Sequence, residues 1–166
     1  MSGLADFLAE TLAGARVAVL GVGSELCRDD AAGLYAVARM EKEPGLAGLL
    51  LLSGGSAPET FTGAIKTFAP DVLFVVDAAY MDLPAGSFQL LPYEKAAGLS
   101  FSTHMLPLPL MMDYIRSECG CACYVVGIQP ADTSQGIGMS PRVREGARRL
   151  AKMFGEAARK QLKTGN

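Results

Sequence analysis

The segment VLFVVDA, residues 72–78, constrains the fold of this chain more than any other stretch, because it is almost uniformly apolar. A strand with one face in solvent alternates apolar and polar residues, whereas a parallel strand covered on both faces is apolar throughout. We therefore expect a buried strand here, with helices packed on each side of it. Near its end stands Asp77, a carboxylate placed where such a strand meets its following loop.

Strand-like and helix-like segments alternate along the rest of the chain, as in proteins built on a parallel sheet. Apolar runs predict strands at residues 16–22, 48–52, 72–78, 87–91 and 123–128. Apolar residues at helical spacing predict helices at residues 30–42, 58–68, 108–117 and from 141 onward, after a short amphipathic helix within residues 1–14. Right-handed crossovers place helices on both faces of such a sheet. We predict the α/β class: a three-layer α/β/α sandwich with a mostly parallel sheet of about five strands.

Length and charge exclude several classes of protein. We expect one domain over residues 1–166, because this length buries a single core. Fifteen basic and seventeen acidic residues give a net charge of −2, which provides no basic surface for nucleic acid. The longest apolar run, residues 46–52, is far shorter than the ~20 residues of a membrane-spanning helix. Residues 1–14 lack a basic start and include Asp6 and Glu10, unlike a secretion signal. We expect a cytoplasmic protein with no nucleic-acid or membrane partner.

The stretch GVGSELCRDDAAG, residues 21–33, follows the first predicted strand. A dinucleotide-binding fingerprint needs a third glycine where this chain has Leu26, and the lysine of a phosphate-binding loop is missing. Asp29 and Asp30, at the start of the next predicted helix, would also repel a phosphate. Helix capping explains one of the two aspartates. The other remains available for a function.

Nucleophilic catalysis has few candidates in this sequence. None of Ser24, Ser56 and Ser87 has the glycine flanks of a nucleophile elbow. His104 is the single histidine, so any mechanism that uses an imidazole must use it. Cys27, just before a predicted helix, could pair with His104 as a thiol nucleophile.

The remaining cysteines form the segment CGCAC and lead into the last predicted strand; they are Cys119, Cys121 and Cys123. Alternate residues of a strand share a face, so their sulfurs could converge on a metal ion. A structural zinc site, however, needs a second cluster or a histidine nearby. We expect reduced, packed thiols instead.

Three potential metal ligands fall in the loops where functional groups of an open parallel sheet collect. Asp30 follows the first strand, Asp77 ends the third, and His104 lies in the loop before residue 108. Two carboxylates and an imidazole form a mixed oxygen and nitrogen site that suits zinc, nickel or a similar divalent ion. The structural alternative is that the aspartates cap loops and the histidine is merely packed.

Five segments, taken together and in order, resemble the nickel-iron hydrogenase maturation endopeptidases; they are GVGSELCRDDAAG, GGSAPE, VVDA, STHMLPL and GIQP. The branch that processes the large subunit of the formate hydrogenlyase hydrogenase is the most similar to this chain. The resemblance implies an α/β/α sandwich and a cytosolic protease. Such a protease removes a C-terminal extension from the hydrogenase large-subunit precursor once nickel has been inserted.

The resemblance also implies a ligand set, because the family's metal ligands fall by motif on Asp30, Asp77 and His104. The implied metal is nickel supplied by the precursor and used as a recognition handle, although zinc or another divalent ion could occupy the site. Alternatively, the three residues hold a Lewis-acidic metal that activates water, and Asp30 or Asp77 could act as general base. We expect a monomer or a weak homodimer.

This chain departs from the family pattern at three positions. Ser24 replaces a usual asparagine, Ala31 a usual glycine, and Ser53 an aspartate before GGSAPE. The altered first motif supports one alternative, a non-catalytic metal-binding maturation adaptor. A second alternative is the Cys27/His104 thiol hydrolase.

Overall fold

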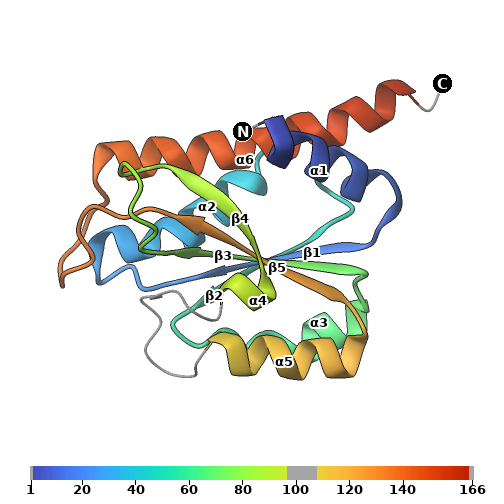
Figure 1. Ribbon diagram of the computed structural model, residues 1–166, viewed down its shortest axis with the longest axis horizontal. Coiled ribbons are helices and arrows are strands. Elements are labelled where there is room, and N and C mark those ends of the chain that lie inside the picture. The colour runs from blue at the N-terminus through green and yellow to red at the C-terminus, as the bar shows by residue number, and fades with distance from the viewer. Residues whose placement is uncertain (1, 97–107, 165–166) are drawn as a thin grey trace.

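The computed structural model of the chain describes residues 2–96 and 108–164. One sheet runs through it in the order β2-β1-β3-β5-β4 (Figure 1). The parallel strands are β1 (Val17–Val22), β2 (Leu50–Gly55), β3 (Val72–Ala78) and β5 (Ala122–Ile128). The edge strand β4 (Phe88–Pro92) is antiparallel to β5. The predicted mostly parallel sheet of five strands is thereby confirmed.

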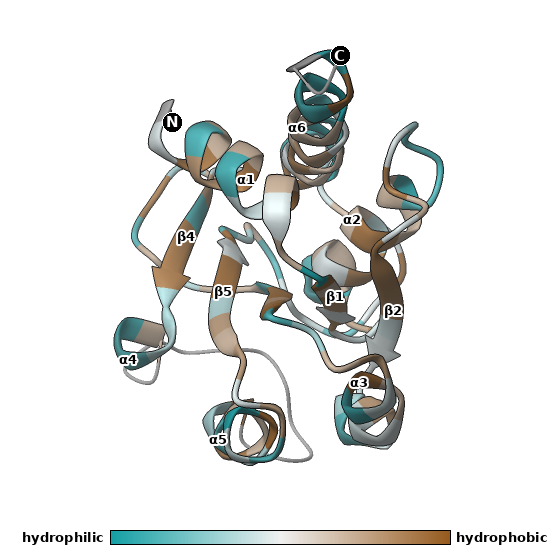
Figure 2. Cartoon of the chain, turned by 90° about the vertical axis from the view of Figure 1, so that its right-hand side faces the viewer, coloured by the Kyte–Doolittle hydropathy of each residue, from teal (hydrophilic) through white to brown (hydrophobic). Residues whose placement is uncertain are grey.

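Helices cover both faces of the sheet, as Figures 1 and 2 show. On one face lie α1 (Ser2–Gly14), α2 (Ala32–Met40) and α6 (Pro141–Thr164). On the other lie α3 (Thr62–Phe68) and α5 (Leu108–Cys119). The short helix α4 (Tyr93–Ala96), which the sequence analysis did not predict, follows β4. This is the three-layer α/β/α sandwich expected from the sequence.

Strand β3 explains why its sequence is apolar throughout. Phe74 and Val76 enter the core shared with α1, α2 and α6, whereas Leu73 and Val75 enter the core shared with α3 and α5. All four side chains are fully buried. A strand covered on both faces therefore has no position left for a solvated side chain.

The N-terminal helix α1 packs on the body of its own chain. Leu8 is fully buried against α6, and the Phe7 ring meets the Tyr124 ring edge-on at 5.0 Å. The Gln161 side chain of α6 donates a hydrogen bond to the Ala9 carbonyl at 2.6 Å. Helix α1 thus completes the apolar layer above the sheet. No helix in the described part of the chain is long and apolar enough to cross a membrane.

Two predicted helices begin differently from the expectation. The segment predicted as one helix at residues 30–42 starts with a 3-10 turn, η1 (Arg28–Ala31), before α2, and the helix predicted from residue 58 starts with η2 (Pro58–Phe61) before α3. The prediction that one aspartate of the pair caps its helix is wrong. Neither η1 nor α2 has a side-chain cap, because Asp29 and Asp30 accept hydrogen bonds from other segments.

Candidate active site

Asp30 and Asp77 both lie at the carboxyl edge of the sheet. Asp30 is in η1, which follows β1 after a turn of residues 23–27, and η1 contacts β3, in which Asp77 is the next-to-last residue. Their side chains are 1% and 0% exposed. Burying a carboxylate is costly unless a cation, a proton or hydrogen-bond donors compensate its charge. Two buried carboxylates therefore stand on adjoining segments at this edge of the sheet.

Glycines bring the two segments together by letting backbone contact backbone. A Cβ on Gly33, in the first turn of α2, would lie 2.1 Å from the Val76 carbonyl oxygen. Gly23, at a φ of +137°, lies against the Asp30 carbonyl, where a Cβ would come within 1.8 Å. Side chains cannot fit at either position. Gly33 thus lets the start of α2 lie on the end of β3, and Gly23 lets the chain after β1 lie against η1.

The turn before Asp30 is built by Ser24. Its backbone N–H donates to Asp30 Oδ2 at 2.9 Å, and its hydroxyl oxygen accepts from the Leu26 N–H at 3.2 Å. Ala31 has an ordinary right-handed helical conformation, so this position requires no glycine. Serine and alanine therefore support the turn at two of the positions where the sequence departs from the family pattern.

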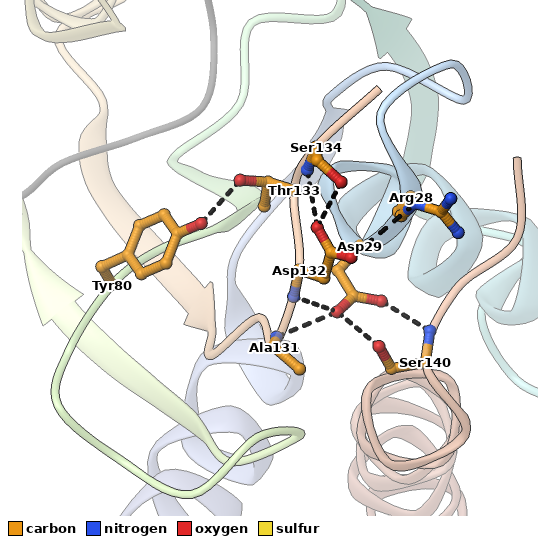
Figure 3. A network of polar contacts seen from close by, with 8 residues as sticks. All are labelled: Arg28, Asp29, Tyr80, Ala131, Asp132, Thr133, Ser134 and Ser140. Atoms are coloured by element: carbon orange, nitrogen blue, oxygen red, sulfur yellow. Dashed lines mark hydrogen bonds and ion pairs between the residues drawn. The ribbon is translucent and has the colours of Figure 1, made fainter. Parts of the chain in front are cut away.

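Asp29 is the residue that sequence reasoning missed. Its buried carboxylate accepts four hydrogen bonds, which Figure 3 shows. Asp29 Oδ2 accepts from the N–H groups of Ala131 and Asp132, both at 2.9 Å, and from the Ser140 hydroxyl at 2.8 Å; Oδ1 accepts from the Ser140 N–H at 2.6 Å. Asp29 therefore fastens η1 to the segment that joins β5 to α6.

Backbone contacts extend this connection to the next part of the same segment. The N–H of Arg28 donates to the Gly136 carbonyl at 3.0 Å, and the Gly136 N–H donates to the Leu26 carbonyl at 2.8 Å. The Arg28 side chain lies 3.7 Å from the Asp132 carboxylate. Hydrogen bonds from Ser134 lower the pKa of Asp132. The loop before Asp30 and the segment before α6 thus form one rim (Figure 3).

Gln129 is a second residue whose role the sequence did not reveal. It belongs to the motif GIQP and is buried at the end of β5. Its Oε1 accepts from the N–H groups of Met81 at 2.6 Å and Leu83 at 3.3 Å, and its Nε2 donates to the Pro130 carbonyl at 3.2 Å. Gln129 thereby holds the loop that follows β3 and Asp77.

The third predicted ligand, His104, lies outside the described residues, so its distance to Asp30 and Asp77 stays a prediction. The Cys27/His104 pair stays a prediction for the same reason. Within residues 2–96 and 108–164, no three His, Cys, Asp or Glu side chains are arranged to hold a metal ion. The structure brings the segments of Asp30 and Asp77 together.

The CGCAC cysteines lie at the opposite, amino end of β5. Cys121 and Cys123 are buried with their sulfur atoms 3.8 Å apart, and Cys119 is half-buried beside them. A hydrogen bond from Cys123 lowers the pKa of Cys121 to about 7, and that same contact raises the pKa of Cys123. They pack in the core between the sheet and α5, as reduced thiols would.

A groove of about 740 Å³ opens beside the turn that precedes Asp30. The turn residues Gly23 and Ser24 line it, and so does Tyr35 of α2. Ser56, after β2, and Met139, before α6, complete it. A buried acidic edge next to an open groove suits an enzyme that hydrolyses a bond in an extended substrate, as a peptidase does.

The chain is similar to known proteins in both sequence and fold. The family model described as hydrogenase maturation protease matches residues 34–157. The hydrogenase 3 maturation protease of Escherichia coli K12 is 32% identical over 113 residues, which cover 68% of this chain and 71% of that protein. The crystal structure of the [NiFe] hydrogenase maturation protease HycI from Thermococcus kodakarensis superposes with a TM-score of 0.82 at 30% identity, covering 92% of this chain and 99% of that one. The solution structure of the endopeptidase HycI from Escherichia coli gives 0.71 at 27% identity, covering 82% and 87%.

The fold and the family match define the class of this protein, a peptide-bond hydrolase with an α/β/α sandwich. The chain belongs to the HycI family of hydrogenase maturation proteases. The matched residues 34–157 include Asp77 and His104, and the T. kodakarensis structure extends the likeness over most of the chain.

Proposed function

We propose that this protease removes the C-terminal extension of a nickel-iron hydrogenase large-subunit precursor after nickel has been inserted. The observation that carries the proposal is the pair of buried carboxylates, Asp30 and Asp77, at one edge of the sheet beside an open groove. The E. coli relative is named a hydrogenase 3 maturation protease, which supports a hydrogenase precursor as the substrate. We place the reaction in the cytoplasm.

Nickel enters this proposal as part of the substrate. Asp30 and Asp77 supply oxygen donors and His104 a nitrogen donor, a set compatible with nickel, zinc or a similar ion. The precursor's own metal ligands complete the coordination. A precursor without nickel then offers nothing for these side chains to bind, so the metal acts as a recognition handle.

The chain itself contributes proton transfer and positioning. One carboxylate takes a proton from the water that attacks the scissile carbonyl carbon, and returns it to the leaving amine nitrogen as the peptide bond breaks. The Ser24 N–H orients Asp30 through its 2.9 Å hydrogen bond, and Gln129 holds the loop after Asp77. Burial keeps bulk water away from both carboxylates.

The test compares nickel-loaded and nickel-free large-subunit precursors, each incubated with the purified protein. Mass spectrometry follows the loss of the C-terminal peptide. Cleavage of the loaded form alone supports the proposal. Cleavage of both forms would contradict the role of nickel as a handle. Stable binding without product would instead favour the non-catalytic maturation adaptor.

A further inference from the structure

The groove beside Asp30 has an apolar rim that the proposed proteolytic site does not explain. Ile137 is 82% exposed and Leu26 is 64% exposed, and both line the groove. Large apolar side chains exposed together at the edge of a groove are typical of interaction surfaces. They stand on the rim described above, where Gly136 exchanges hydrogen bonds with Leu26 and Arg28. Backbone pairing therefore holds these apolar residues in place.

The strand that lines the groove favours an extended peptide. Ser53 and Gly55 of β2 line it, and β2 is an edge strand paired, among the described residues, with β1 alone. An unpaired strand edge offers backbone donors and acceptors to an added extended chain. Leu34 and Tyr35 of α2 also line the groove and add apolar surface. Gly23 and Ser24, in the turn before Asp30, line it as well.

The charge of the groove indicates what the peptide carries. Arg28 and Arg144 line it, against a single acidic side chain, Glu25. Arg28 already faces Asp132 at 3.7 Å, whereas Arg144, exposed in the first turns of α6, forms no ion pair with a described residue. A guanidinium in this position can bind a carboxylate of the occupant with two hydrogen bonds.

We propose that this groove binds an extended, apolar segment of the precursor polypeptide that carries an acidic side chain and adjoins the bond to be cut. The segment pairs with the edge of β2, packs its apolar side chains on Ile137 and Leu26, and meets Arg144 with its carboxylate. This inference rests on the proposed function, because it takes the precursor as the occupant. It adds a recognition surface that is separate from the buried carboxylates.

Photo-crosslinking tests the occupant directly. The photoreactive amino acid p-benzoylphenylalanine replaces Ile137, and as a matched control it replaces Leu162, which is 72% exposed near the end of α6. Each protein is illuminated with a nickel-loaded large-subunit precursor, and mass spectrometry identifies the joined peptides. We expect position 137 alone to join the segment around the cleavage site. Joining to a second copy of this chain, to a distant part of the precursor, or to nothing would overturn the proposal.

Steady-state kinetics provide the second test. Ile137→Asp and Arg144→Glu should each raise KM about tenfold, the size of effect expected when an interface anchor is lost, with kcat nearly unchanged. The Arg144→Glu effect should shrink at high salt, because screening weakens exposed ion pairs. The controls are Leu162→Asp and Arg142→Glu. Arg142 lies in the first turn of α6, as Arg144 does, but it lines a different pocket, with Gly86 and Ser87. Both controls should keep the wild-type KM.

The outcomes separate this inference from the proposed function. If the wild-type protein cleaves the precursor but Ile137→Asp and Arg144→Glu behave like their controls, the groove proposal is wrong and the protease function stands. If the wild-type protein cleaves nothing, the protease function fails. Crosslinking from position 137 then still decides whether the groove binds the precursor.

Discussion

The two ends of the sheet bury groups of opposite character. At the carboxyl edge lie three carboxylates, Asp29, Asp30 and Asp77, and at the amino end of β5 lie the thiols of Cys121 and Cys123. Asp29 accepts four hydrogen bonds from residues more than 100 positions away in sequence. The thiols contact one another and the apolar core.

This difference shows what each group requires in order to be buried. A charged carboxylate needs several hydrogen-bond donors that point at its oxygens, so hydrogen bonds join distant segments at the carboxyl edge. A protonated thiol such as that of Cys123 behaves as a small apolar side chain and needs only packing, whereas the Cys121 sulfur also has the Cys123 thiol as a hydrogen-bond donor. We therefore expect substitutions at the carboxyl edge to change both activity and stability, and substitutions among the thiols to change little beyond local packing.

The largest effect is expected at Asp77. Asp77→Asn keeps the size of the side chain but removes its charge and its ability to accept a proton, so processing of a nickel-loaded precursor should fall by about 10²- to 10⁴-fold. Asp30→Asn should behave alike. Product formation is measured by mass spectrometry, and circular dichroism checks that the variants are folded. Near-normal cleavage by a folded Asp77→Asn protein would remove Asp77 from the site.

Substitution of Asp29 should act mainly on the stability of the fold. Asp29→Ala leaves buried donors of Ala131, Asp132 and Ser140 without their acceptor, so the free energy of unfolding should fall by about 3 to 5 kcal/mol. Urea denaturation measures this loss. The matched control is Asp132→Ala, an exposed aspartate of the same rim, which should unfold close to the wild-type midpoint. Equal midpoints for both variants would show that the Asp29 network is not structural.

The thiols provide a pH-dependent prediction. The hydrogen bond from Cys123 lowers the pKa of Cys121 to about 7, below its ordinary value. One thiolate should therefore form as the pH rises through about 7, detected by its ultraviolet absorbance, while Cys123 stays protonated. In Cys123→Ala the donor is lost while burial remains, so this titration should move to higher pH. An unchanged titration in that variant would assign the signal to another cysteine.

The smallest effect is expected at Cys27. It is half-buried and contributes to the turn through its backbone, whose N–H donates to the Ser24 carbonyl and whose carbonyl accepts from the Asp30 N–H. A serine keeps both hydrogen bonds, so Cys27→Ser should process the precursor within about twofold of the wild-type rate. An inactive, well-folded Cys27→Ser protein would establish the thiol mechanism in place of the carboxylate one.

Most of the fold could be predicted from the sequence, because strands buried on both faces and helices with one apolar face leave direct patterns. The apolar run that forms β3 predicted a strand in the central sheet and a layer of helices on each side of it. The four-residue helix α4 was not predicted, because a single helical turn is too short to show a periodic apolar pattern. The predicted starts of α2 and α3 were too early, because the apolar spacing of a short 3-10 turn resembles that of the helix that follows it.

The candidate site could be predicted only in part. Asp77 stands near the end of β3 and Asp30 in the turn that follows β1, so the order of the elements alone brings their segments to one edge. The role of Asp29 was hidden because its partner Ser140 lies 111 residues away, and no local pattern records such a hydrogen bond. The neighbouring sequence suggested that Asp29 caps a helix. In the structure its carboxylate instead accepts hydrogen bonds from the segment before α6.

The contact between Gly33 and the Val76 carbonyl has a consequence for protein engineering. The relative position of the segments that carry Asp30 and Asp77 is set by one backbone resting on another, and not by the side chains that line the groove. If the groove binds the precursor as proposed, exchanging residues such as Ile137 should retarget the protease toward a new peptide sequence without touching this backbone contact. The same contact forbids even a methyl group at position 33.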